Sequence, residues 1–570
     1  MGTSGDRKGY KVFSINTTVR NPKRNTEFLK LFKKYHGEIF DKEKSYQYFF
    51  DLVKKGVYRL TNISEAVKMK IENDEELSSS EVATAIKQNP QATGLVGRVM
   101  TQLRSMKDQG FLMFEPIKRG LKKIYITKLG NDLIENNIDA TLIYTKAMMG
   151  MHANSPIRVT MLNQSRPFLN TIFTINEVNK RWVLLGNEPK GILYHEFSTF
   201  VLSMKDCDYM KSANEIIKYR LKNKFKIKIN ELKDYLVENN ILPIADDSFL
   251  KDYPDDVYRK FEMTGLLTKH GAFNYIYINF SKYNIQKIES ILEDYKNYKF
   301  EHFSSVKEYY DYINNIEIPW QKDEIIRQKI IESKSQILQI QLDKSLTLSQ
   351  QEEFLDRIFY SKALENAVHK FNFKIINREL LILSGLVKEK SKFDEISEPL
   401  RLEYLLALLF GKKYGLLGLV SNIIYSEDGS PLHFAPASKC DMMYHNAEGS
   451  FILEPTMQRG KNQLLNNETT NIVRHIKDET RKNGLNYRAM MIAPYVHPDI
   501  VEFFSYQADH NVVNIAPLNI NRFVTLIFDS DNIKLLCQNF DTIVTDLIKM
   551  DSSKFSDLIN NHIVSENIYK

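Results

Sequence analysis

The sequence predicts a multidomain, mainly α-helical chain with winged-helix (α+β) domains in its first half and an α/β domain at its C-terminal end. Three observations support this fold class. The 570 residues, 43% of them hydrophobic, suffice for several domains of about 150 residues. The order helix, turn, helix, hairpin occurs twice in the first half. After Glu395, helices alternate with short apolar strands. The predicted boundaries are 1–149 and 150–297 for two winged-helix domains, 298–386 for a helical linker and 387–570 for the α/β domain.

Composition narrows the class of protein. Lys and Arg number 78 against 71 Asp and Glu, a mild excess that is compatible with nucleic acid binding but not diagnostic of it. The three cysteines, Cys207, Cys440 and Cys537, are too far apart for a zinc site and favour a reduced, intracellular protein. The polar start of the chain and the lack of an 18-residue apolar run predict a soluble cytoplasmic protein with no membrane partner.

The first module begins with a capping signal at residues 78–81, which predicts a helix that ends at Asn89-Pro90. Apolar residues at helical spacing predict a second helix from about Thr93 to Gly110. Two strands follow, at 111–114 and 123–127. This order is typical of a winged helix, a variant of the helix-turn-helix.

Positive charge collects in this module, with eight basic residues against two acidic ones between Gly97 and Lys128. Basic side chains on the second helix and the hairpin can contact phosphates, and Arg98 or Gln102 can reach base edges. A winged helix that binds another protein and exposes a solvated basic face is the alternative. The candidate DNA-binding residues here are Arg98, Gln102, Arg104, Lys118, Arg119, Lys122 and Lys123.

The N-terminus adds Arg20, Lys23 and Arg24 around the Asn21-Pro22 turn. These residues are candidates for a basic arm on a phosphate backbone, although an ordinary solvated charge run is nearly as good an explanation.

The helix, turn and hairpin pattern recurs later in the chain. Residues 258–267 resemble 106–112, and a Lys269-His270-Gly271 turn precedes a strand at 275–278. This second module is less basic at its hairpin, so part of its role is expected to be structural. An amphipathic helix over 321–342 then separates the two halves of the chain.

In the last domain, one acid flanks each strand of a predicted hairpin, and both acids lie at the end away from the turn. Asp441 comes directly before the apolar run 442–444, and Glu454 comes directly after the run 451–453, with a turn at 446–449. A buried carboxylate needs a partner, and a hard cation is a natural one. Acids that happen to lie at exposed strand ends are the alternative.

Further acids could join this pair. Glu403 lies in the apolar helix 400–409, and Glu468 and His475 lie on a helix around 468–483. Carboxylates that converge at a sheet end bind Mg²⁺, which can polarise a phosphate and activate water.

Together these motifs resemble a known family. Asp441 and, after a 13-residue gap, Glu454-Pro455-Thr456 resemble the PD-(D/E)XK nuclease signature. With the domain order, the sequence resembles the AlwI family of type IIS restriction endonucleases and their nicking relatives over nearly its whole length. The further matching segments are Glu468 with 473–475, the strand ending at 491–494, residues 515–518, and 16–22 at the N-terminus.

The resemblance implies a type IIS endonuclease that binds a short asymmetric duplex sequence and cuts at a fixed distance from it with Mg²⁺, for which Mn²⁺ can substitute. It implies that Asp441 and Glu454 bind the metal and that the Pro455 carbonyl is a further ligand. Glu403 matches a helix acid that holds a metal-bound water. Glu468 and His475 match the acid and histidine near the site.

Two positions depart from the general signature. Cys440 stands where it has Pro, and Thr456 stands where it has Lys. Since Thr456 carries no positive charge, the missing role falls to His475 or to Lys461, and the sequence leaves both open.

Three functions remain: a Mg²⁺-dependent endonuclease that leaves 5′-phosphate ends, a DNA-binding protein whose nuclease-like domain is inert, and a structure-selective nuclease. The sequence does not separate nicking from double-strand cleavage. Double-strand cleavage would need a transient dimer or a partner nuclease subunit. A companion DNA methyltransferase is expected if host DNA must be protected.

Overall fold

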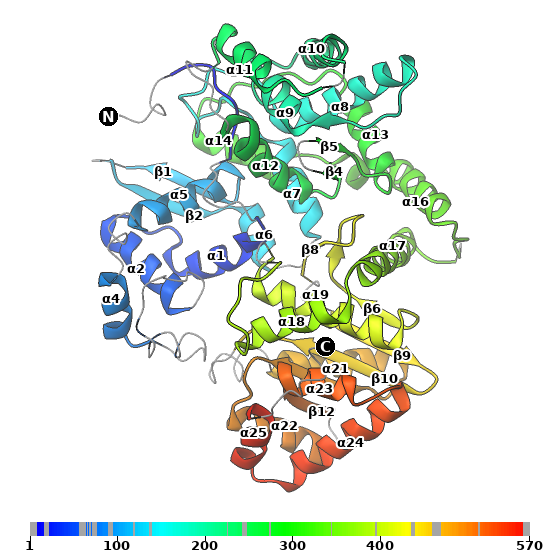
Figure 1. Cartoon of the computed structure of the whole chain (residues 1–570). Coiled ribbons are helices and arrows are strands. Elements are labelled where there is room, and N and C mark those ends of the chain that lie inside the picture. The colour runs from blue at the N-terminus through cyan, green and yellow to red at the C-terminus, as the bar shows by residue number, and fades with distance from the viewer. Residues whose placement is uncertain are drawn as a thin grey trace. The chain divides into compact units, whose positions relative to one another are not determined.

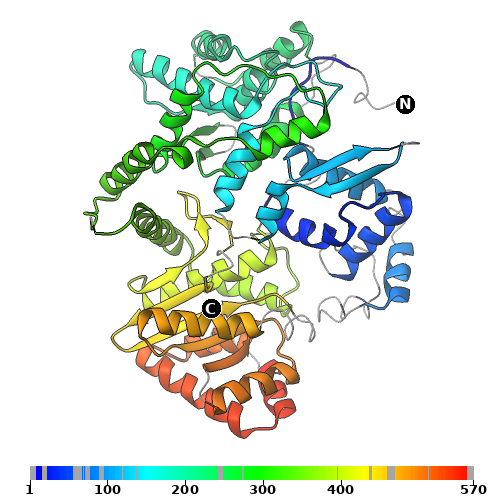
Figure 2. The same cartoon turned by 180° about the vertical axis from the view of Figure 1, so that it is seen from behind.

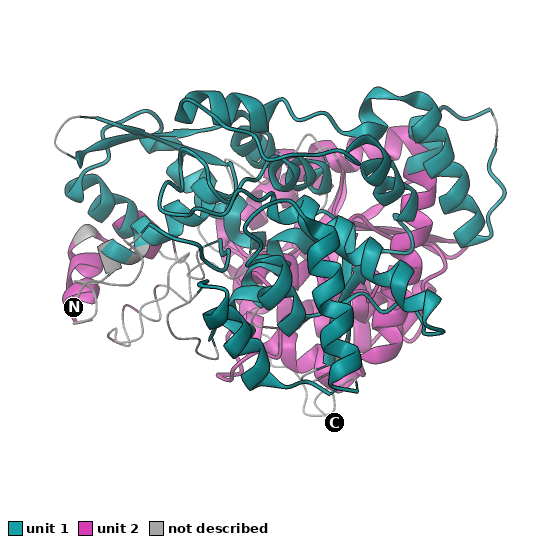
Figure 3. Cartoon of the chain, turned by 90° about the horizontal axis from the view of Figure 1, so that it is seen from above, with its two compact units in different colours: residues 1–49, 93–352 teal, residues 50–92, 353–570 magenta. Residues whose placement is uncertain are grey.

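The computed structural model describes the chain in segments (Figure 1). Among the described residues, no helix is long and apolar enough to cross a membrane. The chain divides into two compact units (Figure 3): unit 1 holds residues 1–49 and 93–352, and unit 2 holds 50–92 and 353–570. The described segments are 8–15, 22–55, 64, 67, 70, 77–88, 95–117, 120–135, 139–224, 226–241, 248–272, 275–343, 345–393, 396–434, 439–458, 469–510 and 513–561.

Unit 1 is mainly helical with two small sheets. Its elements, in chain order, are η1 Pro22–Arg24, α1 Asn25–Phe32, η2 Lys33–Tyr35, α2 Lys42–Lys54 (which continues into unit 2), α5 Leu95–Asp108, β1 Leu112–Pro116, β2 Lys122–Ile126, α6 Lys128–Glu135, α7 Ala140–Met149, α8 Pro167–Leu184, β3 Ile192–Leu193, α9 Tyr194–Glu196, η5 Phe197–Val201, α10 Tyr209–Lys222, α11 Ile229–Glu238, α12 Ser248–Glu262, β4 Leu267–Ala272, β5 Tyr275–Phe280, α13 Ile285–Asp294, α14 Val306–Asn314, α15 Pro319–Lys322 and α16 Glu324–Leu338.

Both hairpins predicted in this unit are present. In the first, β1 pairs antiparallel with β2, so that Leu112 lies opposite Ile126. In the second, β4 pairs antiparallel with β5, and β3 extends this sheet to the order β3-β5-β4. The predicted turn at Lys269-His270-Gly271 is wrong, because these three residues lie within β4 and pair with β5. The sequence did not predict β3, which has only two residues.

Unit 2 contains the predicted α/β domain. Its elements are α4 Ser79–Lys87, α17 Leu348–Lys370 (which begins in unit 1), α18 Phe373–Ser384, α19 Glu398–Tyr414, β6 Leu419–Ser421, β7 Ile424–Tyr425, β8 Pro431–His433, β9 Met442–Asn446, β10 Gly449–Pro455, α21 Thr469–Asn483, β11 Arg488–Ala493, α22 Pro498–Asp509, β12 Asn514–Asn519, α23 Ile520–Phe528, α24 Ile533–Lys549 and α25 Ser552–Asn560.

The core of this domain is a mixed five-stranded sheet in the order β12-β11-β10-β9-β6. β10, β11 and β12 run parallel, whereas β9 is antiparallel to β10 and to β6. Consecutive residues of β10 and β11 are fully buried, which requires that both faces of the sheet are covered. Helices lie on both sides of it (Figures 1 and 2).

The capping signal at the first predicted helix is confirmed. The Ser78 hydroxyl accepts a hydrogen bond from the Glu81 N–H, and the Glu81 carboxylate accepts one from the Ser78 N–H. This helix, α4, belongs to unit 2, whereas α5 belongs to unit 1. The winged-helix assignment and the predicted domain boundaries therefore stay predictions.

Candidate active site

The candidate site lies on the β9–β10 hairpin, whose turn is fixed locally. The Asn446 side-chain oxygen accepts hydrogen bonds from the N–H groups of Glu448 and Gly449 at 2.9 and 3.0 Å. The strands pair with Met442 opposite Leu453. Extending this register by one residue places Asp441 opposite Glu454, so the two predicted metal-binding acids lie at the same end of the hairpin.

The two acids differ in exposure. Glu454 is 5% exposed, because its strand lies between β9 and β11, whereas Asp441 is half-buried. A carboxylate as buried as Glu454 needs compensating positive charge or hydrogen bonds. One partner is His475, on α21, whose Nδ1 lies 3.3 Å from the Glu454 Oε1 atom. The predicted proximity of Glu454 and His475 is therefore observed.

Asn422, just after β6, holds the backbone around Asp441. Its N–H donates to the Asp441 carbonyl at 3.1 Å, and its side-chain Nδ2 donates to the Cys440 carbonyl at 2.6 Å. These two hydrogen bonds fix the chain on both sides of the Asp441 Cα atom. No sequence signal pointed to Asn422, because it lies 19 residues before Asp441 and outside the hairpin.

A further carboxylate borders the site. Burial raises the pKa of the Cys440 thiol, and the negative charges of Glu454, Glu479 and Asp441 raise it further. Glu479 is 7% exposed and follows His475 by four positions on α21, on the same side of that helix. Its carboxylate accepts hydrogen bonds from Lys482 and Asn483. Glu479 was not predicted from the sequence, although its helical spacing from His475 was a usable signal.

Glu403 lies on α19 and is 9% exposed. Burial chiefly raises the pKa of Tyr425, and the charge of Glu403 contributes to the same shift. Tyr425 is hydrogen-bonded to Ser421, the residue before Asn422. Glu403 therefore borders the connection from β6 to β7, the segment that holds Asp441 in place.

Thr456 stands at the position where the nuclease signature has a lysine. Thr456 is 8% exposed, its N–H donates to the Ile492 carbonyl, and its hydroxyl accepts from the Gln458 N–H at 3.1 Å. The Thr456 hydroxyl is thus engaged in a turn after β10. Glu468 and Lys461 lie outside the described residues, so their predicted roles stay predictions.

The acids present suit Mg²⁺. Within the described segments, no group of three or more His, Cys, Asp or Glu side chains is arranged to hold a metal ion. Mg²⁺ is usually bound by only one or two protein carboxylates, with water and substrate phosphate as the other ligands. Asp441 and Glu454, with the Pro455 carbonyl at the end of β10, fit this requirement.

In unit 1, the candidate DNA-binding residues are only partly described. Arg104 on α5 is exposed, and Lys122 and Lys123 on β2 are half-buried. Lys23 and Arg24 in η1 are also half-buried. Gln102 is 6% exposed, so in this conformation its amide does not reach the surface. Arg20, Lys118, Arg119 and the Arg98 side chain lie outside what the structure describes.

Three of the basic side chains form a positive cluster. Burial lowers the pKa of Lys122, and the charges of Arg104 and Lys107 lower it further. The ammonium groups of Lys107 and Lys122 both lie over the Phe114 ring, at 5.6 and 5.3 Å from its centroid. Lys107 is paired with Asp108 at 3.5 Å, so Arg104 and Lys122 are the members of this cluster that a phosphate could contact.

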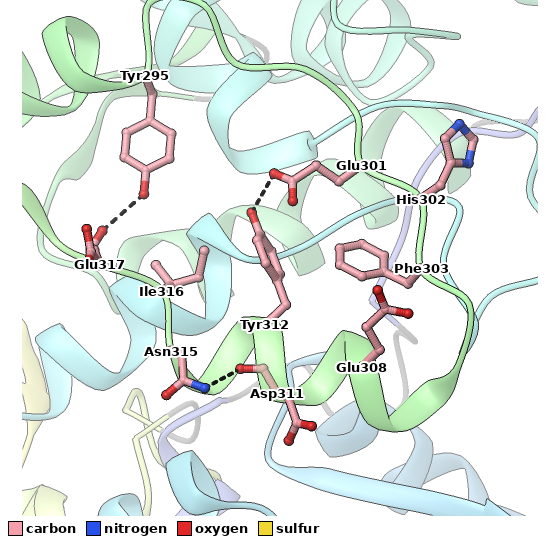
Figure 4. Close-up of a pocket in the computed structure, with 10 residues that line it drawn as sticks. All are labelled: Tyr295, Glu301, His302, Phe303, Glu308, Asp311, Tyr312, Asn315, Ile316 and Glu317. Carbon is pink, nitrogen blue, oxygen red and sulfur yellow. Dashed lines mark hydrogen bonds between the residues drawn. The ribbon is translucent and has the colours of Figure 1, made fainter.

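A cavity of about 670 Å³ in unit 1 is a separate feature (Figure 4). Carboxylates and aromatic rings line it, and the buried Arg166 holds one of these acids, Glu301, at 3.1 Å. None of the candidate catalytic residues belongs to it. Its lining residues are Tyr295, Glu301, His302, Phe303, Glu308, Asp311, Tyr312, Asn315, Ile316 and Glu317.

Comparison with solved structures gives weak global similarity. The small subunit (R.BspD6I2) of the heterodimeric restriction endonuclease R.BspD6I is 17% identical over 32% of this chain and 98% of its own, with a TM-score of 0.28. Restriction endonuclease FokI is 10% identical over 93% of this chain and 99% of its own, with a TM-score of 0.25. No curated protein matches the sequence.

The family of the chain follows from a match to a sequence profile. The sequence profile described as AlwI restriction endonuclease matches residues 108–526, which is well over half of the chain and includes the β9–β10 hairpin with both acids. The chain therefore belongs to the AlwI restriction endonuclease family.

Proposed function

We propose that the protein is a type IIS restriction endonuclease of the PD-(D/E)XK superfamily. Unit 1 binds a short asymmetric duplex sequence through winged-helix modules, and the last domain of unit 2 hydrolyses a phosphodiester at a fixed distance. The proposal is supported by the register of the β9–β10 hairpin, which brings Asp441 and Glu454 to the same end of it, in a member of a restriction endonuclease family.

In the proposed mechanism, Asp441, Glu454 and the Pro455 carbonyl hold Mg²⁺, and Asn422 fixes the backbone that carries Asp441. Bound Mg²⁺ would stabilise charge on the phosphate and help to deprotonate the attacking water. Water attacks phosphorus as the bond to the 3′ oxygen breaks, which leaves a 5′-phosphate and a 3′-hydroxyl. His475, whose Nδ1 lies 3.3 Å from the Glu454 carboxylate, is assigned part of the lysine's role, since a protonated imidazole there would supply the positive charge that Thr456 lacks.

The DNA-binding role rests on the exposed Arg104 and the half-buried Lys122 and Lys123 beside the first hairpin. Phosphate contacts from such residues position a protein on duplex DNA. A single nuclease domain cuts one strand at a time, so double-strand cleavage needs a second copy or a partner nuclease subunit. A cytoplasmic location and a companion methyltransferase belong to the same proposal.

A second candidate is a DNA-binding protein with an inert nuclease-like domain. The engaged Thr456 hydroxyl at the lysine position favours it.

Cleavage of a mapped supercoiled plasmid with Mg²⁺ tests the proposal. We expect discrete breaks from the wild type and none from Asp441→Asn or Glu454→Gln, which keep side-chain size while removing charge. Glu448→Gln, at the exposed tip of the same hairpin, is the matched control and should still cut. Specific DNA binding without cleavage in any divalent metal would instead establish the inert domain.

A further inference from the structure

A dense basic segment of unit 1 has no part in the hairpins discussed above. Between Glu215 and Glu231 the sequence has six basic residues and no acidic one. The segment forms the end of α10, the turn after it and the start of α11 (Figure 1). Five of the six are exposed, at alternate positions for most of its length: Lys218, Lys222, Lys224, Lys226 and Lys228.

The sixth basic residue has a structural role. Arg220 is 5% exposed, and its guanidinium donates to both carboxylate oxygens of the buried Glu196 at 2.8 and 2.6 Å. It also lies over the Trp182 ring, 4.9 Å from the centroid. Arg220 thus anchors α10 to the interior, whereas the lysines on either side point outward.

Hydrogen bonds hold the described residues of this turn, 223–224 and 226–228. The Lys228 N–H donates to the Tyr219 hydroxyl at 2.7 Å, and the Asn223 side chain donates to the Tyr219 carbonyl and to the Glu231 carboxylate. Lys224 has a φ of 50°, which reverses the chain after α10. The exposed lysines are therefore displayed on a preorganised loop.

Their charges are only partly compensated. Lys218 pairs with Glu215 and Lys222 with Glu231, each at 3.0 Å. Lys224, Lys226 and Lys228 form no ion pair with any described residue.

The neighbouring helix is less suited to DNA contacts, because Lys251 is its exposed lysine and its Arg259 pairs with Asp255. α12 precedes the second hairpin, the position of a recognition helix in a winged helix. Its Val257, Tyr258 and Phe261 are fully buried, and its Lys260 is neutralised by Asp256 inside the core. The basic turn is thus the feature of this module best suited to an extended polyanion.

We infer that the α10–α11 turn, through Lys224, Lys226 and Lys228, binds the phosphate backbone of duplex DNA. The choice of duplex DNA rests on the proposed function. Lysine acts on phosphate as a flexible point charge, so the turn adds affinity without reading bases. The second module thereby contacts DNA through this turn rather than through its hairpin.

The test is the salt dependence of binding to a random-sequence 30-base-pair duplex, measured by fluorescence anisotropy on the full chain in EDTA. Each phosphate contact contributes about 0.9 to the slope of log K against log salt. The triple variant K224Q/K226Q/K228Q should lower that slope by about 2 to 3. A matched triple in the same unit, K296Q/K299Q/K307Q, removes the same charge from other exposed lysines and should lower it by less than about 1.

The variant K224R/K226R/K228R keeps the charge and should keep the slope, which excludes loss of fold as the cause. An unchanged slope in the glutamine triple, with plasmid cleavage by the wild type intact, overturns this inference alone. Loss of binding to single-stranded RNA with an unchanged DNA slope would assign the turn to RNA. A wild type that neither cuts nor binds DNA overturns the proposed function as well.

Discussion

Asn422 donates to both carbonyls that flank the Asp441 Cα atom, from its backbone N–H and from its side-chain amide, so it fixes the backbone that carries that carboxylate. Asn422→Ala removes the hydrogen bond to the Cys440 carbonyl and should destabilise the domain by about 1 kcal/mol. Loss of such outer support around a metal ligand typically costs 10- to 100-fold, so we expect plasmid cleavage to slow by roughly that factor. Mg²⁺ binding by calorimetry should weaken in parallel.

Asn446→Ala is the control for this prediction, because it removes hydrogen bonds from the turn at the other end of the same hairpin. It should lower stability to a similar degree while cleavage continues. Equal loss of activity in both variants would mean that Asn422 only maintains the fold.

The buried His152 should make the folding stability of unit 1 depend on pH. The residue is fully buried among aromatic rings, and burial lowers its pKa to about 3. The unfolded chain binds a proton near pH 6.5 that the folded chain excludes, so stability is lost as pH falls below about 6.5. The loss should reach ~2 kcal/mol by pH 5.

Both tryptophans, Trp182 and Trp320, lie in unit 1, so tryptophan fluorescence during urea unfolding reports this unit. His152→Gln should flatten the difference in stability between pH 7 and pH 5. An equal difference in wild type and variant would assign the acid sensitivity to other groups.

At the residue scale, the placement of Asp441 and Glu454 was predictable because the hairpin pattern fixes their register. Their role as metal ligands stays a prediction. Asn422 was not identified, because its role depends on how the chain after β6 packs against that hairpin, which leaves no periodic signal in the sequence. Glu479 was not identified either, although it follows His475 by four positions on α21.

At the scale of the element, Gly418 allows β6 to pair closely with β9. Its φ is 91°, and a Cβ atom there would lie 1.9 Å from the His445 carbonyl oxygen, where β6 meets β9. Gly418→Ala must therefore displace β6, and we expect a loss of about 2–4 kcal/mol in calorimetric unfolding. Because Asn422 follows β6, cleavage should fall as well.

Gly385→Ala is the control for Gly418→Ala, because it introduces the same backbone strain without the steric clash. Gly385 has a similar φ of 85° but nothing within 4 Å of its Cβ position, so its replacement should cost only about 1–2 kcal/mol. Equal losses at the two glycines would show that strain alone, and not the contact with β9, limits this position.

Elements with a strong local signal were predicted well. The helix at 400–409, the β9–β10 hairpin and the strand at 487–493 are all present with small differences at their ends. The predicted linker helix over 321–342 divides into α15 and α16, because Asp323 accepts hydrogen bonds from the N–H groups of Ile325 and Ile326 and so starts a new helix. β7 and β8 were missed because strands of two or three residues show no alternation.

At the scale of the molecule, the candidate metal ligands and the basic residues belong to different compact units. Removal of divalent metal with EDTA should therefore abolish cleavage while DNA binding persists. A gel-shift assay in EDTA, with Asp441→Asn in Mg²⁺ as the comparison, measures this. Loss of binding in EDTA would mean that the two activities depend on a shared structure.

Burial raises the pKa of all three thiols, to about 11 for Cys207 and well above the usual range for Cys440. Since the thiolate is the reactive form, alkylating agents and mild oxidants should modify the native protein only slowly. Stocks should tolerate handling without reductant. A cysteine introduced on the exposed surface would then be the preferred point of attachment for a fluorophore, which makes the natural chain a ready background for single-molecule work.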